Sequence, residues 1–132
     1  STGALAHVAT SADSNDHSHA AGVIRDMSDA AAAGTLDARS AFLYAQAVET
    51  VHGAAQAAPW YEFVANSDEH NAAAAMWVGA FKLRAGDDAG LRYLYEAAHD
   101  PAFREHASAL IARELDRLGH HEEAASWRRA IA

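Results

Sequence analysis

The sequence predicts an all-α fold of about seven helices, and three observations support this prediction. Alanine accounts for 36 of the 132 residues, and alanine loses no side-chain entropy when it enters a helix. The β-branched residues are scattered, and only two prolines interrupt the chain. Glycine follows a helical stretch at four places, where a residue of left-handed conformation is expected to end the helix: Gly34, Gly53, Gly86 and Gly119.

The N-terminal part is predicted to hold a polar arm and two helices. Residues 1–18 carry Ser, Thr, Asp, Asn and His without sustained periodicity, which predicts a flexible acidic arm. A helical pattern begins at Ser18 and ends at Gly34. Asp37 is a candidate N-cap for a second helix that ends near His52. Four residues of this second helix share one face, which we expect to point to the core: Leu43, Ala47, Val48 and Val51.

The middle of the chain predicts two more helices. Pro59 suits the first turn of a short helix, because the missing N–H of proline has no helical partner there. That helix carries the aromatic residues Trp60, Tyr61 and Phe63. Ser67 or Asp68 is then a candidate N-cap for a helix over residues 69–85.

Three helices are predicted in the C-terminal part. Asp87 or Asp88 is expected to cap a helix that ends near His99. Asp100 followed by Pro101 predicts an N-cap and a first helical residue, for a helix that runs to Leu118. A last helix covers residues 121–131. The chain beyond its arm, residues 19–132, is therefore predicted to form a single all-α domain.

Composition excludes several classes of function. No cysteine is present, so disulfides and thiolate metal sites are excluded. No apolar run approaches the roughly 20 residues of a membrane span, and the N-terminus lacks the pattern of a signal peptide. We therefore expect a cytoplasmic protein with no membrane partner.

The charge distribution argues against nucleic acid as a partner. The net charge is −8, and residues 1–70 hold nine acids against two arginines. Residues 71–132 hold nine acids against seven arginines and Lys82. Because binding to a phosphate backbone needs a positive field, an overall acidic chain is not expected to bind nucleic acid.

A repeat of 33 residues relates the last two predicted hairpins. Gly86 and Gly119 are 33 residues apart, and this shift places Val78 and Gly79 on Ile111 and Ala112. A fixed period in the low thirties with two helices per period is typical of a helical solenoid, in which each hairpin buries its apolar face on its neighbours.

Residues 71–132 resemble two degenerate tetratricopeptide repeats. The first unit matches the pattern of that family at Val78, Gly79, Gly86, Tyr95 and Ala98, and the second at Ile111, Ala112, Leu115, Gly119 and Ala124. Three features depart from it: Leu91 replaces a small residue, Arg128 replaces an aromatic one, and Pro101 comes about two residues early. The resemblance implies a right-handed array of stacked antiparallel hairpins that binds a protein partner without catalysis or a cofactor.

The candidate binding site is a stripe along the first helices of the two units. His106, Leu110, Arg113 and Arg117 follow the spacing i, i+4, i+7, i+11, and the repeat shift maps them onto Ala73, Trp77, Ala80 and Arg84. In tetratricopeptide-like arrays these positions line the concave groove. We therefore expect a partly apolar, basic surface for an acidic or carboxylate-ended peptide, formed by Trp77, Arg84, His106, Leu110, Arg113 and Arg117.

A purely structural role for the residues of this stripe is the alternative. In it, the arginines pair with acids on the helix surface, for example Arg113 with Glu114 or Asp116, and Trp77 belongs to the core. The last predicted helix has no polar capping helix after it, which favours self-association or a longer parent chain.

The sequence offers three alternative functions. Glu49 with His52, and Glu96 with His99, have the Glu-x-x-His spacing of di-metal helical bundles, but both pairs are expected to face water. The segment "DSNDHSH" offers Asp13, Asp16, His17 and His19 as weak metal ligands. An effector or sensor domain of a larger regulator is the third alternative. No phosphate-binding glycine loop, zinc-protease motif or nucleophile elbow supports an enzyme.

Overall fold

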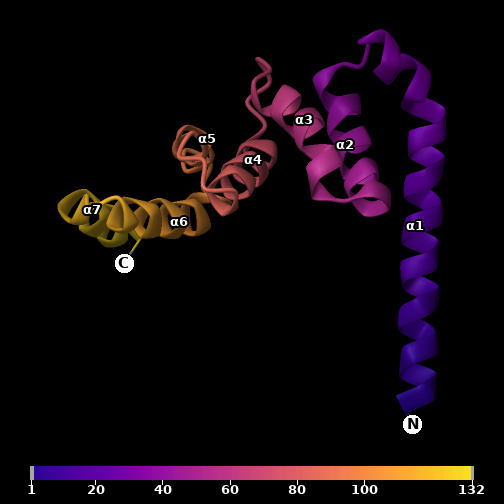
Figure 1. Cartoon of the computed structure of the whole chain (residues 1–132), viewed down its shortest axis with the longest axis horizontal. Helices are drawn as coiled ribbons and strands as arrows, with labels where there is room; N and C mark the ends of the chain where they lie inside the picture. The colour runs from indigo at the N-terminus through magenta and orange to yellow at the C-terminus, as the bar shows by residue number, and fades with distance from the viewer. Residues whose placement is uncertain (1, 132) are drawn as a thin grey trace. The chain divides into compact units, whose positions relative to one another are not determined.

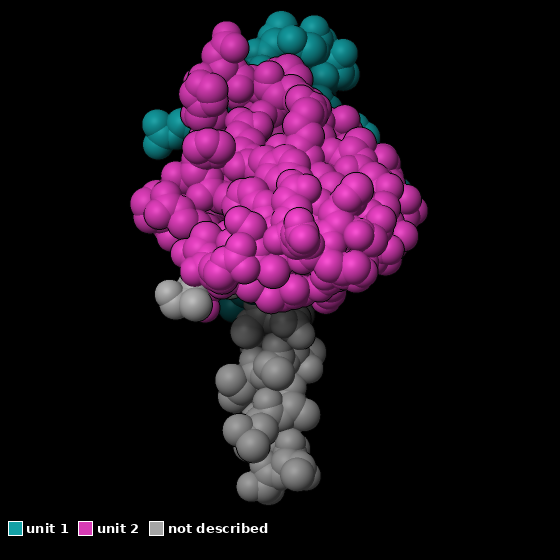
Figure 2. Space-filling view, turned by 90° about the vertical axis from the view of Figure 1, so that its left-hand side faces the viewer, with its two compact units in different colours: residues 1–60 teal, residues 61–132 magenta. Residues whose placement is uncertain are grey.

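The computed structural model describes the backbone of residues 2–131 and the side chains of residues 15–130. The described chain contains seven α-helices and no strand (Figure 1), which confirms the all-α prediction. None of the described helices is both long and apolar enough to cross a bilayer. The chain divides into two compact units where the sequence predicts one domain: unit 1 covers residues 1–60 and unit 2 residues 61–132 (Figure 2).

Unit 1 consists of α1 (Thr2–Ala33), α2 (Ala38–His52) and the first part of α3 (Ala54–Ala65). The predicted boundaries around α2 are confirmed. Gly34 and Gly53 have φ of 70° and 93°, and only glycine adopts such angles without strain. Asp37 caps α2, since the Ser40 N–H donates to its Oδ1 at 2.8 Å.

The start of α1 differs from the predicted arm. The helix begins at Thr2 rather than near Ser18. The physical reason is that the segment holds no proline and only Gly3 as a helix-breaking residue, while its alanines favour helix. The side chains of residues 1–14, including the candidate ligand Asp13, lie outside the described residues. Asp16, His17 and His19 are exposed on α1.

Alanine accounts for nearly all of the buried hydrophobic residues in the described part of unit 1. The helices α1 and α2 pack against each other, and the buried residues of the described part are Ala20, Ala38, Ala41, Ala45, Ala47, Val48 and Ala57. Leu43 is 48% exposed and Val51 is half-buried, so the predicted core face of α2 is wrong at Leu43. The buried face is instead centred on Ala41, Ala45 and Val48. An edge contact of Tyr44 with Trp60, with ring centroids 4.9 Å apart, links α2 to α3.

Two predicted starts were misplaced around the middle of the chain. Pro59 lies inside α3 and not in its first turn, because the alanine-rich residues before it already form helix even though Pro59 cannot donate a hydrogen bond to the Ala55 carbonyl. Asn71, and not Ser67 or Asp68, caps α4 (Ala72–Arg84): the Ala74 N–H donates to Oδ1 of Asn71 at 3.0 Å.

Unit 2 contains the end of α3 and two helical hairpins. The first is α4 with α5 (Gly90–Ala97), and the second is α6 (Arg104–Arg117) with α7 (His121–Ile131). Gly86 and Gly119 end α4 and α6 with φ of 78° and 90°, as predicted. The start of α6 lies three residues after Pro101, because Asp100 closes a turn instead: its Oδ1 accepts from the Ala102 N–H at 2.9 Å.

Large side chains and two glycines form the interior of unit 2. Helix α5 packs on α4 and α6, α7 packs on α6, and α4 also contacts α6. At the crossing of α4 and α5, a Cβ on Gly90 would lie 2.6 Å from the carbonyl oxygen of Gly79, so the two backbones touch. The fully buried side chains of unit 2 include Val64, Val78, Tyr93, Leu94 and Ile111.

Candidate functional site

The predicted stripe borders a pocket between α4 and α6. This α4–α6 pocket has a volume of about 240 Å³ and is lined by Ala80, Leu83, Arg84, His106, Leu110, Arg113 and Glu114. Four of the six predicted residues therefore line it: Arg84, His106, Leu110 and Arg113. The helical spacing explains their convergence, because residues at i, i+4 and i+7 of α6 lie on one face. Leu83 and Glu114 were missed, since they lie off the projected stripe.

Arg117 lies outside the lining of this pocket because acids hold its guanidinium. Its Nη2 donates to Oδ1 of Asp88 at 2.8 Å, and its Nε donates to Oε1 of Glu114 at 2.8 Å. Glu114 is only 8% exposed, and the hydrogen bond from Arg117 lowers the pKa of its carboxyl below the usual range. Glu114 therefore stays ionised, with its charge balanced by Arg117.

The two remaining arginines of the stripe, Arg84 and Arg113, line the pocket. None of the ion pairs between described side chains involves Arg84 or Arg113. Asp116 pairs with Arg128 and His121, and Glu114 pairs with Arg117. The charge of Arg113 also helps to lower the pKa of Glu114, which agrees in part with the alternative in which Arg113 interacts with this neighbouring acid. The pocket therefore presents two guanidinium groups, from different helices, beside Leu83 and Leu110.

Trp77 lies in an aromatic stack and not in the pocket. Its ring stacks on Tyr61 with centroids 4.1 Å apart and on Phe81 with centroids 5.1 Å apart. The stack joins α3 to α4 within unit 2, and Trp77 is half-buried in it. This arrangement agrees with the alternative in which Trp77 serves packing.

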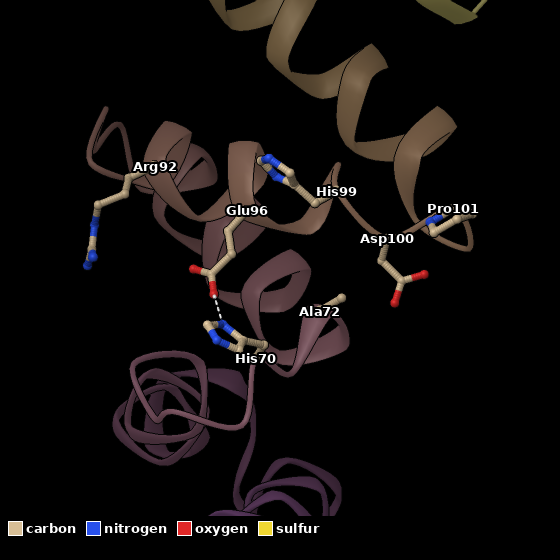
Figure 3. A pocket seen from close by; sticks show the side chains of 7 residues that line it. All are labelled: His70, Ala72, Arg92, Glu96, His99, Asp100 and Pro101. Carbon is tan, nitrogen blue, oxygen red and sulfur yellow. Dashed lines mark ion pairs between the residues drawn. The ribbon is translucent and has the colours of Figure 1, made fainter.

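A second, wider hollow contains one of the two Glu-x-x-His pairs. It has a volume of about 770 Å³ and is lined by His70, Ala72, Arg92, Glu96, His99, Asp100 and Pro101. Figure 3 shows that Glu96 points toward His70, with Oε1 3.8 Å from Nδ1, while the imidazole of His99 lies apart from this pair. His99 is oriented by its own helix, because its Nδ1 lies 2.9 Å from the carbonyl oxygen of Tyr95 and can only donate to it.

The described residues do not form a metal centre. No three histidine, cysteine or carboxylate side chains among them come together with a geometry that fits a metal ion. Glu96 is half-buried and His99 exposed, and in unit 1 Glu49 is half-buried and His52 exposed. A stable metal site needs at least three protein ligands in most cases, so these pairs do not provide one by themselves.

Comparison with known proteins gives no relative for this chain: no family model, no curated protein and no solved structure matches it.

Proposed function

We propose that unit 2 is a non-catalytic peptide-binding module of tetratricopeptide type, and that its α4–α6 pocket binds an acidic segment of a partner protein. The observation that carries the proposal is the convergence of Arg84 and Arg113. These residues are 29 positions apart in the sequence, yet both line one small pocket together with Leu110.

The order of helix contacts supports the repeat part of the proposal. Each hairpin packs its two helices together, α5 contacts α6, and α4 contacts α6 across the hairpins. In tetratricopeptide arrays the first helices of successive units lie beside each other in the same way and form the floor of the groove. The touching backbones at Gly79 and Gly90 agree with the small residue that the family pattern places at the Gly79 position, while Gly90 precedes Leu91, where the chain departs from the pattern.

The chemistry of the lining favours a carboxylate next to an apolar group. Guanidinium groups form two parallel hydrogen bonds with a carboxylate, and such pairs are stronger than neutral hydrogen bonds. Leu83, Leu110 and Ala80 supply an apolar surface beside them. Glu114 also lines the pocket, and its ion pair with Arg117, which also pairs with Asp88, reduces the repulsion of an acidic ligand by these two acids.

Charge reversal at the two arginines tests the proposal. We expect Arg84→Glu combined with Arg113→Glu to weaken binding of a fluorescent peptide rich in Asp and Glu at least tenfold, measured by fluorescence anisotropy. A peptide in which Gln and Asn replace the acids should bind weakly to both proteins. Because the arginines are exposed, the affinity should also fall as the salt concentration rises.

Arg129→Glu is the matched control. Arg129 is an exposed arginine of α7 that does not line the pocket, so its reversal changes the net charge by the same amount per site. An affinity that survives the double reversal, or that falls equally with Arg129→Glu, would contradict the proposed site.

A further inference from the structure

A third pocket lies on the other side of α6. This α5–α7 pocket has a volume of about 240 Å³ and is lined by Tyr95, Ala98, His99, Arg104, Ser108, Trp127 and Ala130. Successive helical residues are rotated by about 100°, which places Ser108 about 160° around α6 from both His106 and Leu110. The pocket is therefore separate from the α4–α6 pocket of the proposed function.

The hydroxyl of Ser108 is the unusual feature of this pocket. Ser108 is 1% exposed, and its Oγ has no hydrogen-bond partner among the described residues. A buried hydroxyl without a partner costs free energy because it has lost its bonds to water. Groups of this kind need an explanation, and a ligand that reaches the hydroxyl is one.

Aromatic rings form one wall of the pocket. Tyr95 on α5 and Trp127 on α7 have ring centroids 5.5 Å apart and planes inclined by 30°. Ala98 and Ala130 leave space beside these rings. The wall therefore suits a flat apolar group, which would gain ring contacts in addition to burial.

Basic groups and hydrogen-bond donors form the other wall. Arg104 is the first residue of α6, and its guanidinium is held by two carbonyl groups: Nε donates to Ala98 at 3.1 Å and Nη2 to His99 at 3.3 Å. A guanidinium has five N–H donors, so these two bonds leave donors for a ligand. The lining contains the basic residues Arg104 and His99 and no acid, and the N-terminus of α6 adds a partial positive charge.

We propose that the α5–α7 pocket binds a small aromatic carboxylate, with its ring against Tyr95 and Trp127 and its carboxylate between the Arg104 guanidinium and the Ser108 hydroxyl. Arg104 and Ser108 are one helical turn apart on the same face of α6, so one carboxylate can accept from both. The burial cost of Ser108 in the free protein is then offset when the ligand supplies an acceptor.

Phenylacetate is the probe, and phenylacetamide is its neutral counterpart. Titration of the full chain, followed by the NMR signals of the tryptophan indole N–H groups, should shift the signal of Trp127, identified with Trp127→Phe. Phenylacetate should bind more tightly than the amide. Ser108→Ala should weaken phenylacetate binding about tenfold, the usual effect of losing a hydrogen bond to a charged group. Ser126→Ala, at an exposed serine of α7, should leave binding unchanged.

The stability of the free variant gives a second, independent result. Because Ser108→Ala removes a buried hydroxyl without a partner, the melting temperature of the free protein should stay the same or rise. A fall would show that the hydroxyl bonds to a carbonyl within α6 and would overturn the proposal. Equal binding of acid and amide, an unshifted Trp127 signal, or unchanged affinity in Ser108→Ala would also overturn it.

Two further experiments distinguish this proposal from the α4–α6 proposal and identify the source of the ligand. The variant Arg84→Glu with Arg113→Glu should bind phenylacetate as the wild type does, so a failure of the α4–α6 proposal leaves this one standing. An acetylated dipeptide that ends in phenylalanine carries the same ring and carboxylate. Tighter binding of the dipeptide than of phenylacetate would identify a peptide C-terminus as the source of the aromatic carboxylate. Weaker binding of the dipeptide would identify a free acid as the source.

Discussion

The two units of the chain are both built from helices but bury different kinds of side chain. In the described part of unit 1, six of the seven buried hydrophobic residues are alanine, and the seventh is Val48. Unit 2 buries Tyr93, Leu94 and Ile111 completely. Since the hydrophobic contribution scales with apolar area at roughly 25 cal/mol per Å², a buried isoleucine contributes far more than a buried alanine.

The comparison shows that a strong preference for helix does not by itself give a well-packed core. Alanine favours the helices of unit 1 through its backbone preference, yet most helical stability in proteins comes from tertiary packing of an apolar face. Among the described residues, unit 2 buries the larger side chains, and they lie on the helices that carry its pockets. We expect unit 2 to resist unfolding more strongly than unit 1.

The largest expected effect is that of Ile111→Ala in unit 2. Ile111 is 0% exposed, and the loss of a buried isoleucine side chain leaves a cavity, so the free energy of unfolding should fall by about 3 kcal/mol. Urea unfolding followed by circular dichroism measures the change.

Leu43→Ala in unit 1 is the control for this comparison. Leu43 is 48% exposed, and its truncation should change the free energy of unfolding by less than about 0.5 kcal/mol. A loss at Leu43 as large as the loss at Ile111 would mean that another surface covers this face of α2 in solution, and the contrast between the units would fail.

Local signals in the sequence predicted much of this fold. The glycines that end helices were recognisable because their backbone angles exclude other residues, and Asp37 was recognisable because its carboxylate caps the next turn. The 33-residue period extended the stripe of α6 onto α4, so that it included Arg84 as well as Arg113, and both residues line one pocket.

Tertiary contacts account for what the sequence did not predict. Arg117 was placed in the site because it continues the stripe, but Asp88, which binds it, lies 29 residues away in the turn between α4 and α5. Trp77 was placed there by the same projection, and stacking on Tyr61 removes it. The α5–α7 pocket was not predicted, since a buried serine without a partner has no sequence signature.

Gly90→Ala is expected to have an intermediate effect in unit 2. Alanine normally stabilises a helix by about 1 kcal/mol relative to glycine, but less at the first residue of a helix. Here the new Cβ would lie 2.6 Å from the Gly79 carbonyl oxygen, a backbone atom that cannot move aside cheaply. The clash should outweigh the helix preference of alanine and lower the free energy of unfolding by about 2 kcal/mol, as measured by urea unfolding.

Gly22→Ala in unit 1 is the matched control and should have the opposite sign. The nearest atom to its new Cβ is the end of the Arg25 side chain at 3.6 Å, an ordinary contact. The helix preference should therefore raise the free energy of unfolding by about 0.5–1 kcal/mol. Stabilisation by both changes would show that α4 and α5 do not touch at Gly79 and Gly90.

The smallest effect concerns the acid dependence of unit 1 and depends on Asp37. The backbone hydrogen bond from Ser40 lowers the pKa of Asp37 below its usual value, so the ionised carboxylate favours the folded state. This contribution to stability is complete above the pKa of an unfolded aspartate, about 3.9, and is lost as the pH falls through the lower pKa of the folded state.

Asp37→Asn keeps an N-cap of similar strength but cannot titrate. The difference in melting temperature between wild type and Asp37→Asn should therefore be constant above about pH 5 and shift against the wild type below about pH 4. A difference that does not change with pH would show that the capping bond is absent in solution and that α2 begins elsewhere.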